Sequence, residues 1–180
     1  MNYHNITKDD MKNGDGLRVV LWVAGCGHHC PGCQNPETWD ENGGIPFDKD
    51  AETDLRKKLS PKYIQGITFS GGDPMYPGNR SEILRICKFV REDFPNRDIW
   101  LYTGYLFEEI KDDPIIRLCD VVVDGRYDAS KRDVSLPWVG SKNQRVIDVK
   151  ESLKSGAVIL HRTEEADGSS LQTVTPCCGC

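Results

Sequence analysis

The stretch AGCGHHCPGCQNPETW, residues 24–39, contains Cys26, Cys30 and Cys33 within eight residues. The run just before it, Val19–Val23, is β-branched and aromatic, which predicts a buried strand that leads into a loop. The loop has no helical or strand period that would bury the thiols, and its glycines permit the tight backbone that brings side chains together. The three cysteines are therefore candidate metal ligands.

Further strands and helices are expected to alternate along the chain. The additional apolar runs that predict strands are Gly66–Ser70, Ile99–Tyr102, Val121–Val123 and Arg145–Val149. The segments that predict helices are Asp48–Leu59, one that starts at Asn79 with Glu82 three residues later, and Leu106–Lys111. This alternation predicts an α/β fold with mostly parallel strands in a single domain. Five strands cannot close an eight-stranded barrel, so we expect a partial, open β/α barrel.

Composition narrows the possible partners and the compartment. The 180 residues suit one domain, expected over residues 1–160 and followed by a polar tail over 161–180. A net charge of −5 without basic runs argues against nucleic acid as a partner. No apolar run approaches the roughly 20 residues of a membrane helix, and no signal-peptide pattern is present, so we expect no membrane partner and a cytoplasmic protein. Clustered cytoplasmic cysteines more often hold metal than form disulfides.

The first four predicted strands each end in a polar or glycine-rich signal. These are Gly25-Cys26, Ser70-Gly71-Gly72-Asp73, Thr103-Gly104 and Asp124-Gly125. Because the carboxyl ends of parallel strands meet at one edge of a sheet, we expect a ligand site there.

Two kinds of metal site compete for the cysteines. Zinc would need four ligands, and Cys30 and Cys33 could combine with Cys177 and Cys180 in a non-catalytic zinc-binding module. That arrangement leaves Cys26 without a role. A 4Fe-4S cluster held by only three thiolates uses all three loop cysteines and leaves one iron open, which favours a catalytic centre.

The spacing C-x3-C-x2-C resembles the signature of the radical S-adenosylmethionine superfamily, and Ser70-Gly71-Gly72-Asp73-Pro74 resembles the element with which that superfamily holds the cofactor's amino group. The resemblance implies S-adenosylmethionine as the second cofactor, bound by Gly71, Gly72 and Asp73. Gly32 stands where many members have an aromatic residue, so the adenine is expected on the backbone of Gly32, Cys33 and Gln34. In related glycyl-radical activating enzymes, strand-end acceptors help to hold the cofactor or a monovalent cation. Thr103 and Asp124 fit that role, or serve as ordinary loop caps.

A narrower resemblance extends over much of the chain, from about Asn2 to Val149. Its most specific segments are residues 25–39, 98–105, 123–127 and 140–145. Together they resemble the activating proteins of anaerobic ribonucleoside-triphosphate reductases. That family's activity would be to form a radical on a glycine of the large anaerobic ribonucleotide reductase subunit, with electrons from a flavodoxin-like donor. Another glycyl-radical enzyme as the target is the alternative within the same chemistry.

Several residues receive other interpretations. His28 and His29 are not assigned as ligands, because a polar, solvated loop position explains them. Cys87 and Cys119 are expected to be small buried hydrophobes. The terminal PCCGC, residues 176–180, could be a redox dithiol, further metal ligands, a docking end for the reductase, or a solvated tail.

Overall fold

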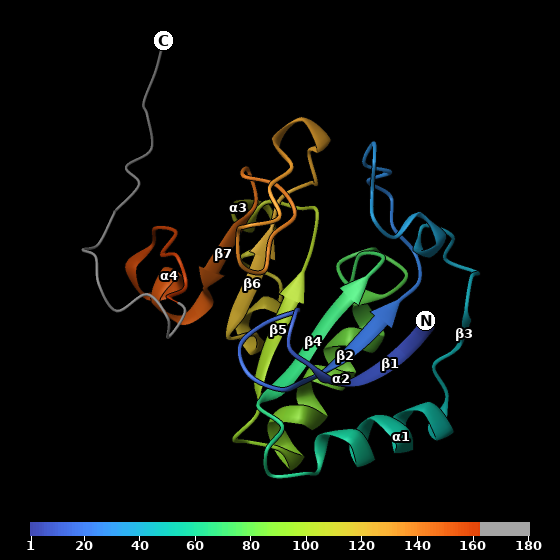
Figure 1. Cartoon of the computed structure of the whole chain (residues 1–180). Coiled ribbons are helices and arrows are strands. Elements are labelled where there is room, and N and C mark those ends of the chain that lie inside the picture. Colours follow the sequence, from blue (N-terminus) through green and yellow to red (C-terminus); the bar gives the residue numbers. More distant parts are fainter. Residues whose placement is uncertain (163–180) are drawn as a thin grey trace.

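The computed structural model describes residues 1–162, which form one seven-stranded sheet in the order β3-β1-β2-β4-β5-β6-β7 (Figure 1). The strands are β1 Asn2–Asp10, β2 Arg18–Val23, β3 Ile45–Pro46, β4 Gly66–Gly71, β5 Asp98–Tyr102, β6 Val121–Asp124 and β7 Arg145–Asp148. The α-helices are α1 Lys49–Leu59, α2 Arg80–Asp93, α3 Phe107–Ile110 and α4 Val149–Ser155. Short 3-10 turns are η1 Pro36–Thr38, η2 Ile116–Leu118 and η3 Ala129–Lys131.

The centre of the sheet is parallel and its two sides are antiparallel. Strands β2, β4, β5 and β6 pair in parallel, whereas β1, β3 and β7 join the sheet through antiparallel pairs. The α/β class and the open sheet are thus confirmed, and parallel pairing holds for the middle only. The curvature of a partial barrel stays a prediction.

The expectation of five strands was wrong, since the sequence pattern missed β1 and β3. In β1 only Ile6 is buried, because the strand lies next to the edge strand and is mostly polar. The two residues of β3 are both exposed. The last strand was expected, but it runs antiparallel to β6 because the connection 125–144 contains no crossover helix that could return the chain to the opposite edge.

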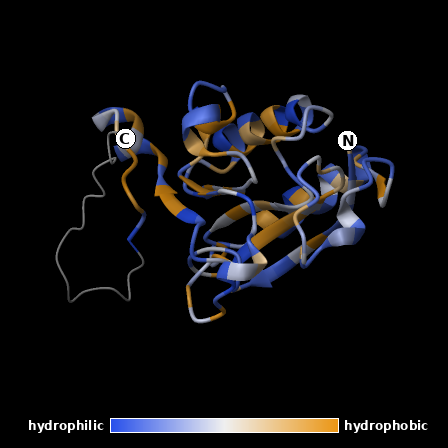
Figure 2. Ribbon diagram, turned by 90° about the horizontal axis from the view of Figure 1, so that it is seen from above, coloured by the Kyte–Doolittle hydropathy of each residue, from blue (hydrophilic) through white to orange (hydrophobic). Residues whose placement is uncertain are grey.

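The two faces of the sheet are covered differently. Seen from above, α1 and α2 lie on one face (Figure 2), and apolar side chains of alternate strand residues, such as Ile99 and Leu101, pack beneath the helices. The intervening residues Trp100 and Tyr102 belong to a second, smaller cluster with Val121 and Val123. Loops rather than helices cover this second face, which leaves room for a pocket.

Helix α2 begins where the sequence predicted, but for a different reason. Asn79 occupies the N-cap position without a side-chain capping bond. Its amide Nδ2 instead donates to the carbonyl oxygens of Ala24 at 2.8 Å and Asp73 at 3.0 Å. The expected burial of Cys87 and Cys119 is confirmed, with 0% and 1% of each residue exposed.

Side-chain contacts within the domain continue as far as His161, near the end of the described residues. His161, the first residue assigned to the tail, places Nε2 2.7 Å from a carboxylate oxygen of Asp15 and its ring 5.1 Å from that of Trp100. The remainder of the predicted tail beyond residue 162, including Cys177, Cys178 and Cys180, lies outside the described residues. Within residues 1–162, no helix is long and apolar enough to span a membrane.

Candidate metal and cofactor site

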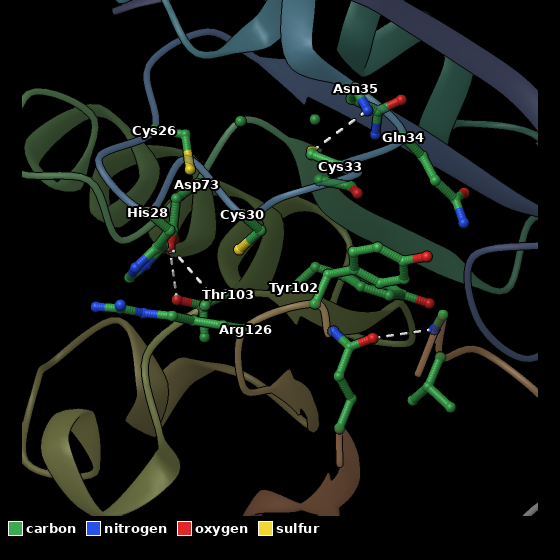
Figure 3. A pocket seen from close by; sticks show the side chains of 18 of the residues that line it. Cys26, His28, Cys30, Cys33, Gln34, Asn35, Asp73, Tyr102, Thr103 and Arg126 are labelled. Atoms are coloured by element: carbon green, nitrogen blue, oxygen red, sulfur yellow. Dashed lines mark hydrogen bonds and ion pairs between the residues drawn. The ribbon is translucent and has the colours of Figure 1, made fainter. Parts of the chain in front are cut away.

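A cavity of about 480 Å³ opens at the carboxyl ends of the central strands, on the sheet face whose side chains include Trp100 and Tyr102 rather than on the helix-covered face. All three loop cysteines line it, together with Gly71 at the end of β4, Gly72 and Asp73 just after it, and Thr103 after β5 (Figure 3). Gln34 lines it as well. The structure therefore brings together most of the residues that the sequence assigned to metal and cofactor binding.

The cysteine loop is held at both ends by backbone hydrogen bonds. Gly25 N donates to Thr38 O at 2.8 Å, Cys26 N donates to Trp39 O at 3.1 Å, and a turn joins Cys33 N to Cys30 O at 3.0 Å. These bonds close the segment 25–39 into a compact loop over the end of β2. Burial raises the pKa of the Cys26 thiol above its ordinary value, and the negative charge of Asp73 acts in the same direction.

The glycine-rich turn after β4 is locked against this loop. Gly72 N donates to Val23 O, and Asp73 N donates to Gly25 O, both at 2.8 Å. A Cβ atom on Gly72 would lie only 2.5 Å from Gly25 O and 2.9 Å from Thr38 O. Glycine is required here because two backbone segments approach each other more closely than any side chain permits.

The carboxylate of Asp73 links three segments of the site. Its Oδ2 lies 2.7 Å from His28 Nε2 and accepts bonds from Thr103 Oγ1 and Gly104 N, both at 3.1 Å, while Oδ1 accepts from Met75 N at 2.8 Å. Asp73 is only 2% exposed. Its side chain therefore aligns the cysteine loop with the ends of β4 and β5.

The expectation that His28 is solvated was wrong, since its side chain is only 7% exposed. The ring packs edge-on against Tyr105, and a Cβ atom on Gly104 would lie 2.4 Å from His28 Cδ2. His29, in contrast, is exposed. The roles of His28 and Asn79 had no sequence signal apart from their positions beside the cysteine and glycine motifs.

Two of the predicted cofactor residues do not face the cavity. Asp124 is fully buried, and its carboxylate accepts bonds from Phe107 N and from the guanidinium of Arg145, which also contacts Glu108. Its oxygens are thus occupied by protein donors. Gly32, with φ of +73°, lies against Ala129 and is absent from the cavity lining.

The segment 140–145 builds one wall of the cavity. Gln144 Oε1 accepts from Gly140 N at 3.0 Å and Ser141 N at 3.2 Å, while its Nε2 donates to Gly125 O at 3.0 Å. These bonds fasten the loop to the end of β6. The sequence singled out this segment only by resemblance, and its local role is to position the wall.

The arrangement of ligands fits a cluster better than a single ion. Among residues 1–162, no three His, Cys, Asp or Glu side chains converge as a single-ion site would require. A 4Fe-4S cluster takes one thiolate for each ligated iron, so its cysteines stand apart around a cavity, as the loop cysteines do here. The donor set of three thiols without a described fourth ligand fits a cluster with one open iron.

Comparisons with known proteins agree with this chemistry. A family model described as a 4Fe-4S single cluster domain matches residues 12–147. The anaerobic ribonucleoside-triphosphate reductase-activating protein of Enterobacteria phage T4 is 47% identical over 146 residues, which cover 81% of this chain and 93% of the relative. This chain belongs to the family of anaerobic ribonucleoside-triphosphate reductase-activating proteins.

Cellular relatives in this activating-protein family are similarly close. The Escherichia coli K12 protein is 43% identical over 150 residues, covering 81% of this chain and 97% of its own. The Pasteurella multocida protein is 40% identical over 150 residues, covering 80% and 95%. As a member of the family, the chain carries a 4Fe-4S domain that includes the entire loop 24–39 and every other residue that lines the cavity.

Proposed function

We propose that this protein activates an anaerobic ribonucleoside-triphosphate reductase by generating a glycyl radical on the reductase's large subunit. The observation that carries the proposal is that the three-cysteine loop and the Gly71-Gly72-Asp73 turn line one cavity and are joined by hydrogen bonds. When bound, a reduced 4Fe-4S cluster and S-adenosylmethionine supply one-electron cleavage of the sulfonium to methionine and a 5′-deoxyadenosyl radical, which takes a hydrogen atom from glycine.

The chain's own residues have positioning roles in this proposal. Cys26, Cys30 and Cys33 would each hold one iron, and the fourth iron would stay available to the amino and carboxylate groups of S-adenosylmethionine. The backbone of Gly71 and Gly72 can approach the cofactor closely because it carries no side chains. Thr103 and the Gly32–Gln34 backbone are proposed as further cofactor contacts, and Asp124 as a support that acts through Arg145.

The names of the relatives support the choice of target, since each is called an activating protein of that reductase. An open sheet, with the curvature of a partial barrel, would admit a loop of a protein substrate at its uncovered side. We further propose a flavodoxin-like electron donor and a cytoplasmic location, where clustered thiols stay reduced.

Anaerobic purification provides the first test. The protein should be brown and absorb at about 400 nm, as thiolate-bound iron clusters do. Cys26→Ala should lose this absorption, whereas Cys87→Ala, which removes a thiol from the helix side of the core, should retain it. Colourless protein with one tightly held zinc would contradict the proposal and favour the zinc-binding module.

The second test addresses the reaction itself. The wild-type protein is incubated with S-adenosylmethionine, a reductant and the large subunit of an anaerobic ribonucleoside-triphosphate reductase, and the glycyl radical is measured by electron paramagnetic resonance. Formation of the radical together with 5′-deoxyadenosine is expected. Cleavage of S-adenosylmethionine without a radical on this reductase, but with one on another glycyl-radical enzyme, would reassign the target.

A further inference from the structure

The cavity extends beyond the cysteines and the glycine-rich turn, along the sheet face that carries Trp100. An aromatic and apolar part of its lining includes Tyr102, Leu136, Trp138 and Val139. The rings of Tyr102 and Trp138 both pack against the small cluster formed by Trp100, Val121 and Val123. None of these four residues is expected to hold the cluster or S-adenosylmethionine, although Tyr102 directly precedes Thr103.

Two polar atoms of this aromatic part have no partner among the described residues. The Tyr102 hydroxyl and the Trp138 indole Nε1 each expose less than 1 Å² and form no hydrogen bond within residues 1–162. The two other side-chain atoms in the same condition belong to His4 and Asn143, which do not line the cavity. A buried polar group without a partner destabilises the protein, so each donor would gain a hydrogen bond if a peptide displaced the groups that cover it.

Both groups are held in place before any ligand binds. The Trp138 ring packs edge-on against Trp100 at 5.9 Å, and the Trp138 backbone has φ of +64°, which is unfavourable for a bulky residue. Burial raises the pKa of the Tyr102 phenol well above its ordinary value, so the hydroxyl keeps its proton at neutral pH. An indole N–H can only donate, and a protonated phenol readily does.

The chemistry of these donors matches the backbone of a peptide. Glycine offers no side chain, so a protein can hold a glycine-bearing segment through the backbone carbonyl groups beside the glycine. Two rigid donors on an apolar wall suit such carbonyl oxygens. Val134, which also lines the cavity, is 77% exposed, as expected at a rim that a protein loop would cover.

We propose that the Tyr102 hydroxyl and the Trp138 indole N–H donate hydrogen bonds to backbone carbonyls of the glycine-bearing loop of the reductase. This inference rests on the proposed function and adds the residues that bind the protein substrate. In this proposal the cysteines and the glycine-rich turn bind the cofactors, and Tyr102 and Trp138 bind the peptide.

The test separates binding of the reductase from chemistry on the cofactor. Tyr102→Phe and Trp138→Phe each remove one donor, and each should raise KM for the large reductase subunit about three- to tenfold, as expected for one hydrogen bond. The double variant should combine both effects. Iron content and the rate of S-adenosylmethionine cleavage by dithionite-reduced protein without the reductase should equal those of the wild type.

Control variants distinguish the loss of these two donors from a general effect of substitution. Tyr63→Phe removes the hydroxyl of a residue that is 55% exposed and distant from the cavity lining, so it should leave KM unchanged. If Trp138→Phe fails to fold, Tyr102→Phe decides alone, because it removes a single oxygen. A wild-type KM for the reductase in Tyr102→Phe, or a raised KM for S-adenosylmethionine instead, would overturn the inference. A wild-type protein that forms no glycyl radical would overturn the proposed function as well.

Discussion

At the scale of single residues, Asp73 illustrates how a motif residue acquires its role. The sequence assigned Asp73 to cofactor binding, and it does line the cavity. However, its carboxylate is surrounded by protein groups, among them His28 and Thr103. The motif was predictable because its letters are adjacent in the chain. Its partners were not, since 45 positions separate His28 from Asp73 and 30 separate Asp73 from Thr103.

Replacing Gly72 by any larger residue is predicted to destabilise the protein. Gly72→Ala would place a Cβ atom 2.5 Å from Gly25 O, and neither backbone segment can move without breaking the bonds between the two loops. We expect the free energy of unfolding, measured with urea, to fall by about 1–3 kcal/mol. Gly27→Ala is the control, because its Cβ atom would meet nothing closer than Tyr76 at 3.8 Å. Equal losses in the two variants would show that the close approach is not the cause.

At the scale of elements, the strongly apolar strands were predictable and the polar ones were not. β2 and β4 are buried along nearly their whole length, and apolar residues such as Val19, Ile67 and Phe69 mark them in the sequence. β1 carries a single buried residue, and its place is set by pairing with β2 rather than by its composition. The direction of β7 followed from the connection before it and not from its own residues.

Asp120 joins three elements and predicts a pH dependence of stability. Its carboxylate accepts bonds from Arg91 of α2 at 2.6 Å and from Ile99 N of β5 at 2.8 Å, and pairs with Lys150 of α4 at 2.7 Å. Burial alone would raise the pKa of Asp120, but the bonds from Lys150 and Arg91 outweigh it and lower the pKa below its ordinary value. A lowered pKa means that Asp120 stabilises the fold most when ionised.

Asp120→Asn should therefore destabilise the protein by about 1–3 kcal/mol at pH 7, as expected for lost bonds to a charged group. The difference from wild type should shrink as the pH falls below the unfolded-state pKa of about 3.9 and through the lower folded-state value. Urea unfolding between pH 3 and pH 7 measures this. Asp112→Asn, whose side chain is 84% exposed, should show no such dependence. A constant difference across the range would contradict the assignment.

At the scale of the whole molecule, the sheet separates a structural face from a chemical one. The long helices and the main core occupy the first face, and the cavity occupies the second. On the second face, His161 closes the end of the sheet away from the cysteines by contacting Asp15 and Trp100. Loops that are distant in sequence thus build the walls of the cavity, while the helices pack against the opposite face of the sheet.

The terminal cysteines are predicted to be dispensable for cluster binding and for radical formation. Deleting residues 177–180 should leave iron content, absorption at about 400 nm and glycyl-radical yield unchanged, because three thiolates suffice for a cluster with an open iron. Cys30→Ala in the full-length chain is the comparison and should abolish all three signals. Loss of iron on deletion alone would instead assign the terminal cysteines to metal binding.

The sequence by itself determined the spacing of the three cysteines, the glycine-rich turn after β4 and the apolar strands that lead into both. These features are local, since a few covalently linked residues set them. Only the tertiary structure decided that Asp124 pairs with Arg145, that His28 is buried against Gly104, and that two side chains lining the cavity carry donors without a partner in residues 1–162. The physical reason is that a buried side chain takes its partners from the segments that strand pairing and register bring beside it.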